Sequence, residues 1–173
     1  MSSARTGAMP AGKDLGLHSA RQVMKENLIN FGLQGVTGKF EGASDAYIAE
    51  IEAQCGFALP NDYKMFAQSY GASLFGEYCG YRPLEPSPWA ANALQTVDVF
   101  YGMSENAGFD LRKVNARLAN LIVGSRIVVG QDAGANLLLL DRDGGVYFYD
   151  HETGRTYLCA IDFDHFIDSF EKL

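Results

Sequence analysis

Residues 51–66 constrain the fold of this 173-residue chain more than any other segment, because they carry the signals for two helices joined by a tight corner. Before the corner, apolar residues recur on one helical face, and Ser44 is well placed to cap the start of that helix. Gly56 can take the left-handed conformation that ends a helix, and Pro60 suits the first turn of the next one. We therefore predict one helix that begins after Ser44 and a second that continues to Gly71.

The rest of the chain predicts further helices and short strands. Residues 14–32 keep the apolar spacing of an amphipathic helix, and the glycine-rich residues 32–42 indicate a loop. Residues 71–88 mix glycine, proline and aromatic residues, which indicates a short strand with irregular flanks. A strand is also predicted over residues 96–101, and a helix capped by Asp110 follows it.

The last third of the sequence is typical of an antiparallel meander followed by one helix. Glycine-bearing turns separate four segments that we predict as strands, at residues 126–130, 136–141, 146–150 and 156–160. Residues 137–140 are apolar on both faces of their strand, so this strand is expected in the middle of the sheet. Asp162 is placed to cap a closing helix, whose predicted buried face is made of Phe163, Phe166, Ile167 and Phe170.

Composition narrows the class of protein. With 47% hydrophobic residues, the chain suffices for one domain with a substantial core. No apolar run approaches the ~20 residues that span a bilayer, and the N-terminus lacks the order of a secretory signal, so we expect a cytoplasmic protein without a membrane span. The three cysteines, Cys55, Cys79 and Cys159, show no zinc-ligand spacing and are expected to be reduced, mostly buried thiols.

The formal net charge is −7, and acidic residues outnumber basic ones in residues 41–105 and again in residues 126–173. No cluster of lysine and arginine is present to follow a phosphate backbone, which argues against direct binding to nucleic acid. An acidic surface suits a basic protein partner instead. The alternative is that the surplus carboxylates only keep the protein soluble.

Motifs for catalysis and metal binding are incomplete. Around Ser73 and Ser104 the pattern of a nucleophile elbow fails at its final glycine, and neither glycine-rich phosphate motif occurs. Asp141, Asp143 and Glu152 have the spacing of calcium-loop ligands, but valine stands where the sharp turn of that loop needs glycine. We therefore predict a hairpin at this position, with no metal site and no cofactor.

Residues 51–66 resemble the signature of the SUKH superfamily, which includes the yeast Smi/Knr cell-wall-assembly regulators and many bacterial toxin-immunity proteins. In that signature an Ile-Glu pair closes a helix, Gly-Phe-x-Leu-Pro turns the corner, and Asp-Tyr-Lys-x-Phe opens the next helix. The resemblance extends to the turn at residues 129–136, where Ala135 replaces a common glycine. It covers roughly the chain from Ser44 to the C-terminus.

The resemblance implies an α+β fold with a mostly antiparallel sheet of about five or six strands packed against helices. The expected organisation is a disordered or added tail at residues 1–13, an N-terminal helix and linker at residues 14–43, and a SUKH-like (Smi/Knr-like) domain at residues 44–173. The signature residues are then structural, with Glu52 expected to bond a nearby backbone amide. They are Ile51, Glu52, Gly56, Phe57, Leu59, Pro60, Tyr63 and Phe66.

Three functions are open at this point. The resemblance favours a non-enzymatic immunity protein that binds a cognate toxin, for example a nuclease with a basic substrate groove. A regulatory or scaffold protein of the same fold, which binds signalling or cell-wall-assembly partners, is the alternative. A small hydrolase acting through Asp150 and His151 or through Ser73 has the least support from the residues.

Candidate partner-binding residues are aromatic residues in predicted loops and acidic residues near them. Tyrosine and tryptophan are typical anchors of interfaces, and carboxylates around them would steer a basic partner. Trp89, the only tryptophan, fits a core position slightly better than an exposed one. The candidate set is Glu77, Tyr78, Tyr81, Glu85, Trp89, Asp132 and Asp150.

Overall fold

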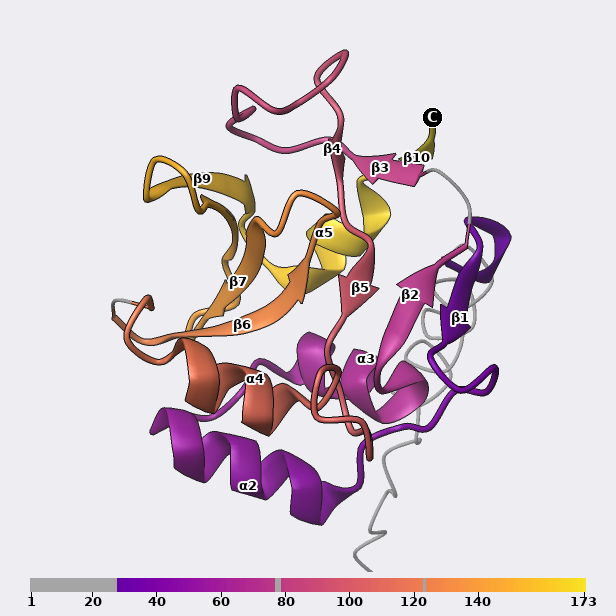
Figure 1. Ribbon diagram of the computed structural model, residues 1–173, viewed down its shortest axis with the longest axis vertical. Helices are drawn as coiled ribbons and strands as arrows, with labels where there is room; N and C mark the ends of the chain where they lie inside the picture. The colour runs from indigo at the N-terminus through magenta and orange to yellow at the C-terminus, as the bar shows by residue number, and fades with distance from the viewer. Residues whose placement is uncertain (1–27, 77–78, 123) are drawn as a thin grey trace, which may run out of the picture.

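A computed structural model describes residues 28–76, 79–122 and 124–173 of the chain (Figure 1). The fold is α+β, with helices packed against a large antiparallel sheet, as expected from the sequence. This sheet has seven strands where about five or six were expected, and a second sheet of three strands, which the sequence did not predict, lies beside it. The predicted N-terminal helix lies almost wholly outside the described residues. Residues 28–30, at its expected end, are helical, and Leu28 is buried.

The large sheet has seven strands in the order β1-β2-β5-β6-β7-β8-β9, and every neighbouring pair is antiparallel. Its last four strands form the predicted meander, in which β7 is an inner strand with all four leucines buried. The strands are β1 (Leu33–Gly35), β2 (Ser73–Phe75), β5 (Val99–Phe100), β6 (Arg126–Gln131), β7 (Leu137–Asp141), β8 (Val146–Asp150) and β9 (Arg155–Ala160).

The small sheet pairs three short strands in the order β10-β3-β4. They are β10 (Phe170–Lys172), β3 (Cys79–Tyr81) and β4 (Gln95–Thr96). The single strand predicted over residues 96–101 is therefore wrong, because the chain leaves the small sheet after β4 and enters the large sheet at β5. The single strand predicted within residues 71–88 is likewise two strands, β2 and β3, in different sheets.

The two-helix corner forms as predicted. Helix α2 (Asp45–Cys55) starts at Ser44, whose Oγ accepts a hydrogen bond from the Tyr47 backbone N–H at 3.2 Å. Gly56 ends α2 with φ at 77°, a left-handed conformation that favours glycine. Helix α3 (Asn61–Tyr70) follows Pro60, whose φ is −55°.

Glu52 stabilises the corner between α2 and α3 through two hydrogen bonds. Its Oε1 accepts a hydrogen bond from the Leu59 backbone N–H at 2.8 Å, as predicted, and another from Lys64 Nζ at 2.9 Å. The pKa of Glu52 is below its usual value, first because of the hydrogen bond from Lys64 and then because of the one from Leu59. The carboxylate therefore ties the end of α2 to the start of α3.

Aromatic rings from several elements meet in the core. The Phe66 ring of α3 lies 4.9 Å from that of Phe100 in β5 and 5.1 Å from that of Phe163 in helix α5 (Phe163–Asp168), measured between centroids. Tyr81 in β3 lies 4.7 Å from Phe166. These contacts join both sheets to the helices that cover them.

Two sequence predictions need correction at the edges of the fold. Residues 32–42, predicted as a loop, contain β1, which pairs with β2 at the edge of the large sheet. The closing helix stops at Asp168 because the Ser169 backbone N–H bonds back to the carbonyls of residues 166 and 167. Phe170 is buried as predicted, but it lies in β10 and pairs with Tyr81.

Ala135 occupies a backbone conformation in which glycine is preferred. Its φ is +64°, and its N–H bonds to the carbonyl oxygen of Asp132 in the turn before β7. Ala135→Gly is therefore expected to raise the free energy of unfolding by about 0.5–1 kcal/mol, because the left-handed strain of alanine exceeds the extra chain entropy of glycine. Urea titration measures this; Ala133→Gly in the same turn is the control and is expected to lower stability.

Candidate protein-binding surface

The predicted partner-binding residues divide into exposed and buried groups. Glu77 and Tyr78 lie outside the described residues. Tyr81 has no exposed surface, because its ring packs against Phe166 and Phe170 and its hydroxyl contacts Cys159 Sγ at 3.6 Å. The prediction that Tyr81 is a loop anchor is therefore wrong: it is a core residue of β3.

The two predicted carboxylates in the last third of the chain are also buried, and they close turns. Asp132, 8% exposed, accepts hydrogen bonds from the backbone and side-chain nitrogens of Asn136 at 2.8 and 2.9 Å. Asp150, 1% exposed, accepts from the Glu152 N–H and the Thr153 hydroxyl at 2.9 and 2.8 Å. Both carboxylates are therefore buried and bonded within the chain, and neither forms part of the accessible surface of the protein.

Trp89 lies at the surface, and the preference for a core position is wrong. It belongs to the long loop between β3 and β4, which projects at the top of Figure 1, and 51% of its surface is exposed. Its indole N–H is bonded to the Asp150 carboxylate. Burial alone would raise the pKa of Asp150, but hydrogen bonds from Thr153, Trp89 and the backbone hold it below its usual value.

Glu85 lies on the same loop and covers the edge of the large sheet. The backbone N–H groups of Leu84 and Glu85 donate to the carbonyl oxygens of Cys159 and Leu158 at 3.0 and 2.8 Å. In return, the Leu158 N–H donates to Glu85 Oε2 at 3.0 Å. Part of the otherwise open edge of β9 is thus occupied by the loop, which protects it against pairing with another chain.

Glu85→Ala removes the acceptor of the Leu158 amide at this edge. We expect faster hydrogen exchange of that amide and a loss of at most about 1 kcal/mol in the free energy of unfolding, because water replaces the carboxylate in part. Glu85→Gln keeps an oxygen acceptor and serves as the control. Equal exchange rates in all three proteins would contradict the assignment of this hydrogen bond as edge protection.

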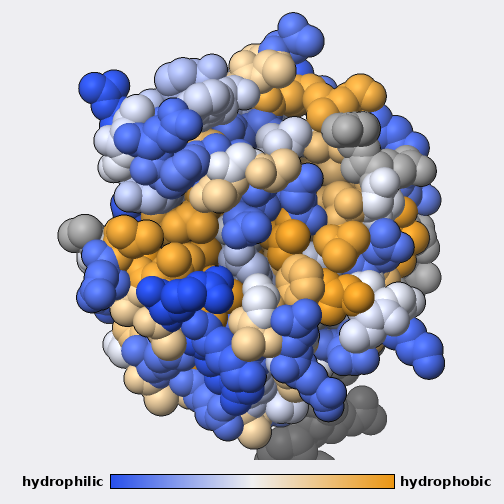
Figure 2. Space-filling model, viewed as in Figure 1, coloured by the Kyte–Doolittle hydropathy of each residue, from blue (hydrophilic) through white to orange (hydrophobic). Residues whose placement is uncertain are grey.

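Large apolar side chains are exposed at several points of the described residues. Figure 2 shows apolar residues at several places on the visible face, at the upper right, at mid-height on the left and near the centre. The exposed set consists of Ile29, Leu84, Trp89, Leu121, Ile161 and Leu173. Three of these residues, Leu84, Trp89 and Ile161, lie along the edge of the large sheet that β9 forms.

We name Leu84, Trp89 and Ile161 the β9-edge patch. The backbone bond from Leu84 to Cys159 brings Leu84 beside the end of β9 that leads into Ile161. The bond from Trp89 to Asp150 places the indole near the other end, since Asp150 pairs with Arg155 at the start of β9. By the rise of a strand these ends are about 17 Å apart, which lies within the span of an ordinary protein–protein interface.

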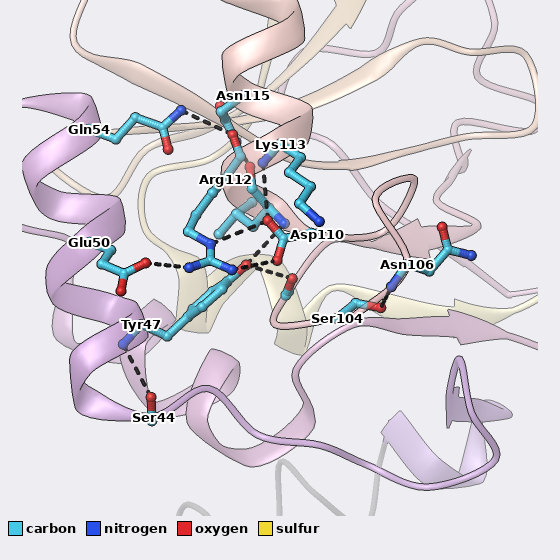
Figure 3. A network of polar contacts seen from close by, with 12 residues as sticks. Ser44, Tyr47, Glu50, Gln54, Ser104, Asn106, Asp110, Arg112, Lys113 and Asn115 are labelled. Carbon is cyan, nitrogen blue, oxygen red and sulfur yellow. Dashed lines mark hydrogen bonds and ion pairs between the residues drawn. The ribbon is translucent and has the colours of Figure 1, made fainter.

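A buried polar network that the sequence did not predict as a unit joins α2 to helix α4 (Leu111–Leu118), as Figure 3 shows. Tyr47 Oη donates to the Gly102 carbonyl oxygen at 2.8 Å and accepts from the Leu111 N–H at 3.1 Å. The Arg112 guanidinium lies 4.4 Å from the centre of the Tyr47 ring. Sequence spacing identified only the cap of α4 by Asp110, because the other contacts join distant segments.

The charges of this network are satisfied within it. Asp110, which has no exposed surface, accepts hydrogen bonds from Arg112 and from the Lys113 N–H, and Arg112 also pairs with Glu50. Burial, followed by the charge of Asp110, holds the pKa of Tyr47 well above its usual value. The phenol therefore stays protonated at neutral pH, and its hydrogen bonds join α2 to the start of α4.

The hydrolase hypothesis finds no assembled triad among the described residues. Ser73 lies on β2, and three strands separate it from β8, which ends at Asp150. At about 4.8 Å per strand, Ser73 is far from His151. The His151 ring bonds to Asn136, while the Asp150 carboxylate bonds to Thr153, so these two side chains do not share a hydrogen bond.

The parts of the chain that the structure describes contain neither a metal-binding cluster nor a membrane-spanning helix. There, no group of three histidine, cysteine or acidic side chains is placed to hold a metal ion. Asp141 instead closes the predicted hairpin, its Oδ1 accepting from the N–H groups of Asp143 and Gly145. No helix over these residues is both long and apolar enough to cross a bilayer.

The fold and this surface define a small α+β module, and the comparison with known proteins assigns its family. Residues 42–169 match the SMI1 / KNR4 family (SUKH-1), and the chain belongs to this family. The SPbeta prophage-derived uncharacterized protein YokK of Bacillus subtilis (strain 168) is similar to it, with 30% identity over 139 residues. The similar region covers 70% of this chain and 71% of that protein. The resemblance seen in the two-helix corner is therefore confirmed.

Proposed function

We propose that this chain is a non-enzymatic immunity protein that neutralises a cognate bacterial toxin by binding it directly. The observation that carries the proposal is membership of the SUKH-1 family over residues 42–169, since many bacterial members of the superfamily are immunity proteins. The family generally acts through protein binding. The exposed β9-edge patch supplies apolar area of the kind that interfaces use.

The charge of the chain supports a basic partner. With a formal net charge of −7, the protein would attract a toxin whose substrate groove is basic, as in a nuclease, and would speed their encounter. Binding would take place in the cytoplasm of the producing cell, where such a toxin must be neutralised. No cofactor takes part in this function.

Growth rescue tests the proposal. A candidate toxin from a neighbouring gene is expressed in a host cell with and without the chain, and the two proteins are then co-purified. Restored growth together with a stable complex is the expected result. Rescue without a complex would contradict direct binding, and failure of both would favour the alternative of a regulatory protein with other partners.

A further inference from the structure

Acidic side chains gather beside the β9-edge patch, around the short helix α5. Asp162 directly follows Ile161 in the sequence, Asp164 is the second residue of α5, and Asp168 ends the helix. Asp62, from the start of α3, accepts hydrogen bonds at its Oδ2 from the backbone N–H groups of Phe163 and Asp164 at 3.0 and 3.3 Å. Carboxylates from two distant segments therefore meet around α5, which begins two residues after the exposed Ile161.

The carboxylate of Asp164 is repelled by the carboxylates around it in the free protein. The pKa of Asp164 is raised, first by burial and then by the charges of Asp62, Asp162 and Asp168. His165 is also present and pairs with Asp162, with its Nδ1 2.7 Å from Asp162 Oδ1. The remaining negative charge is unfavourable for the isolated fold, and a positively charged partner would relieve the repulsion.

We infer that the β9-edge patch and the acidic residues around α5 together form the surface that binds the toxin, and that the toxin meets it with basic side chains surrounding an apolar contact. This inference rests on the proposed function and adds the location and chemistry of the interface. Leu84 and Ile161, which are 60% and 61% exposed, provide the apolar contact, and Asp164 and Asp168 provide the charge.

The combination of features favours a basic protein over other partners. Phosphate groups of nucleic acid or of anionic lipids would be repelled by the carboxylates of α5. Exposed leucine, isoleucine and tryptophan next to like charges are typical of an interface with an apolar centre and a charged rim. A protein surface with basic side chains around an apolar contact would fit both the carboxylates of α5 and the exposed apolar side chains.

The test measures binding of the candidate toxin from the growth-rescue experiment, purified with its toxic activity disabled by mutation. Leu84→Ala is expected to weaken binding at least tenfold. Leu121→Ala, which removes the same exposed side chain next to α4, is the matched control and is expected to change affinity less than twofold. Cytochrome c, a basic protein of unrelated shape, tests for non-specific attraction and is expected not to form a complex.

The acidic part is tested with Asp164→Asn combined with Asp168→Asn. Binding of the disabled toxin is expected to weaken at least tenfold and to depend less on salt concentration. The thermal midpoint of the free variant is expected to stay equal or rise, because Asp164→Asn removes repulsion. A merely structural role for these residues would instead lower the midpoint together with the affinity. Glu105→Gln, an exposed acidic residue on another part of the chain, is the control.

The outcomes separate the two proposals. If the unaltered chain neither binds the toxin nor rescues growth, the immunity function fails and this interface fails with it. If the unaltered chain binds and rescues, but the Leu84 and Asp164/Asp168 variants bind as well as their controls, only the location of the interface is refuted. Weakened binding by both variants, with intact controls and unchanged folding, supports the inferred surface.

Discussion

Phe66→Ala is expected to lower the free energy of unfolding by about 3–5 kcal/mol, among the largest effects of any single substitution in this chain. Phe66 is 1% exposed and lies at the centre of the aromatic core, between rings of Tyr70, Phe100 and Phe163 at 4.9–5.1 Å. Truncation removes contacts with a helix, a strand and a second helix at once, and the rings cannot all move to fill the space. Thermal unfolding should show a fall in the midpoint of roughly 10 °C.

Phe57→Ala is the matched control for this prediction. Phe57 belongs to the same corner, but it is only partly buried, at the margin of the core. Its truncation should therefore cost less than half as much as that of Phe66. Equal losses would show that the corner, and not the aromatic cluster beneath it, limits stability.

The two-helix corner could be predicted from sequence because its signals are local. Ser44 caps α2 through residues next to it, and Gly56 adopts its left-handed conformation at the residue where the apolar pattern stops. The meander was predictable for the same reason, since each of its turns joins strands that are adjacent in the sequence. Such elements need no knowledge of the tertiary fold.

Much of the candidate surface was not predictable, because it depends on contacts between distant segments. Tyr81 is surrounded by turn-forming residues in the sequence, yet pairing with Phe170 places it in the core. Trp89 is exposed on a loop, and its partner Asp150 lies 61 positions further along the chain. Ile161 lies near Leu84 because the loop between β3 and β4 runs along β9. No residue pattern within the loop or within β9 indicates this neighbourhood.

Substitutions in the buried network around Asp110 are expected to have the second large effect on the free energy of unfolding. The size of the loss should depend on which member of the ion pair is removed. Arg112→Met should lower the free energy of unfolding by about 2–3 kcal/mol, because it leaves the fully buried Asp110 carboxylate without its cation. Partial exposure of Arg112 keeps the cost below that of a completely buried pair. Asp110→Asn should cost less, since asparagine still caps α4 and Arg112 keeps Glu50 as a partner.

The dependence on pH identifies the carboxylate as the source of this effect. Burial would raise the pKa of Asp110, but hydrogen bonds from Arg112 and the Lys113 N–H bring it below its usual value. Its contribution to stability is therefore present above the pKa of the unfolded chain and is lost as the pH falls through the lower pKa of the folded protein. In Arg112→Met only burial and weaker hydrogen bonds remain, so protonation relieves the buried charge. The difference between the two proteins should narrow from pH 7 toward pH 3, as measured by urea titration.

Combining the two substitutions separates the ion pair from the helix cap. The double variant Asp110→Asn, Arg112→Met has neither charge, so its stability at pH 7 should exceed that of Arg112→Met alone, although it contains one more substitution. Such a recovery requires that the unpaired carboxylate, and not the lost stacking of Arg112 on Tyr47, causes most of the damage. If the double variant is less stable than both single variants, the stacking and the cap dominate, and the charge of Asp110 is incidental to the joining of α2 and α4.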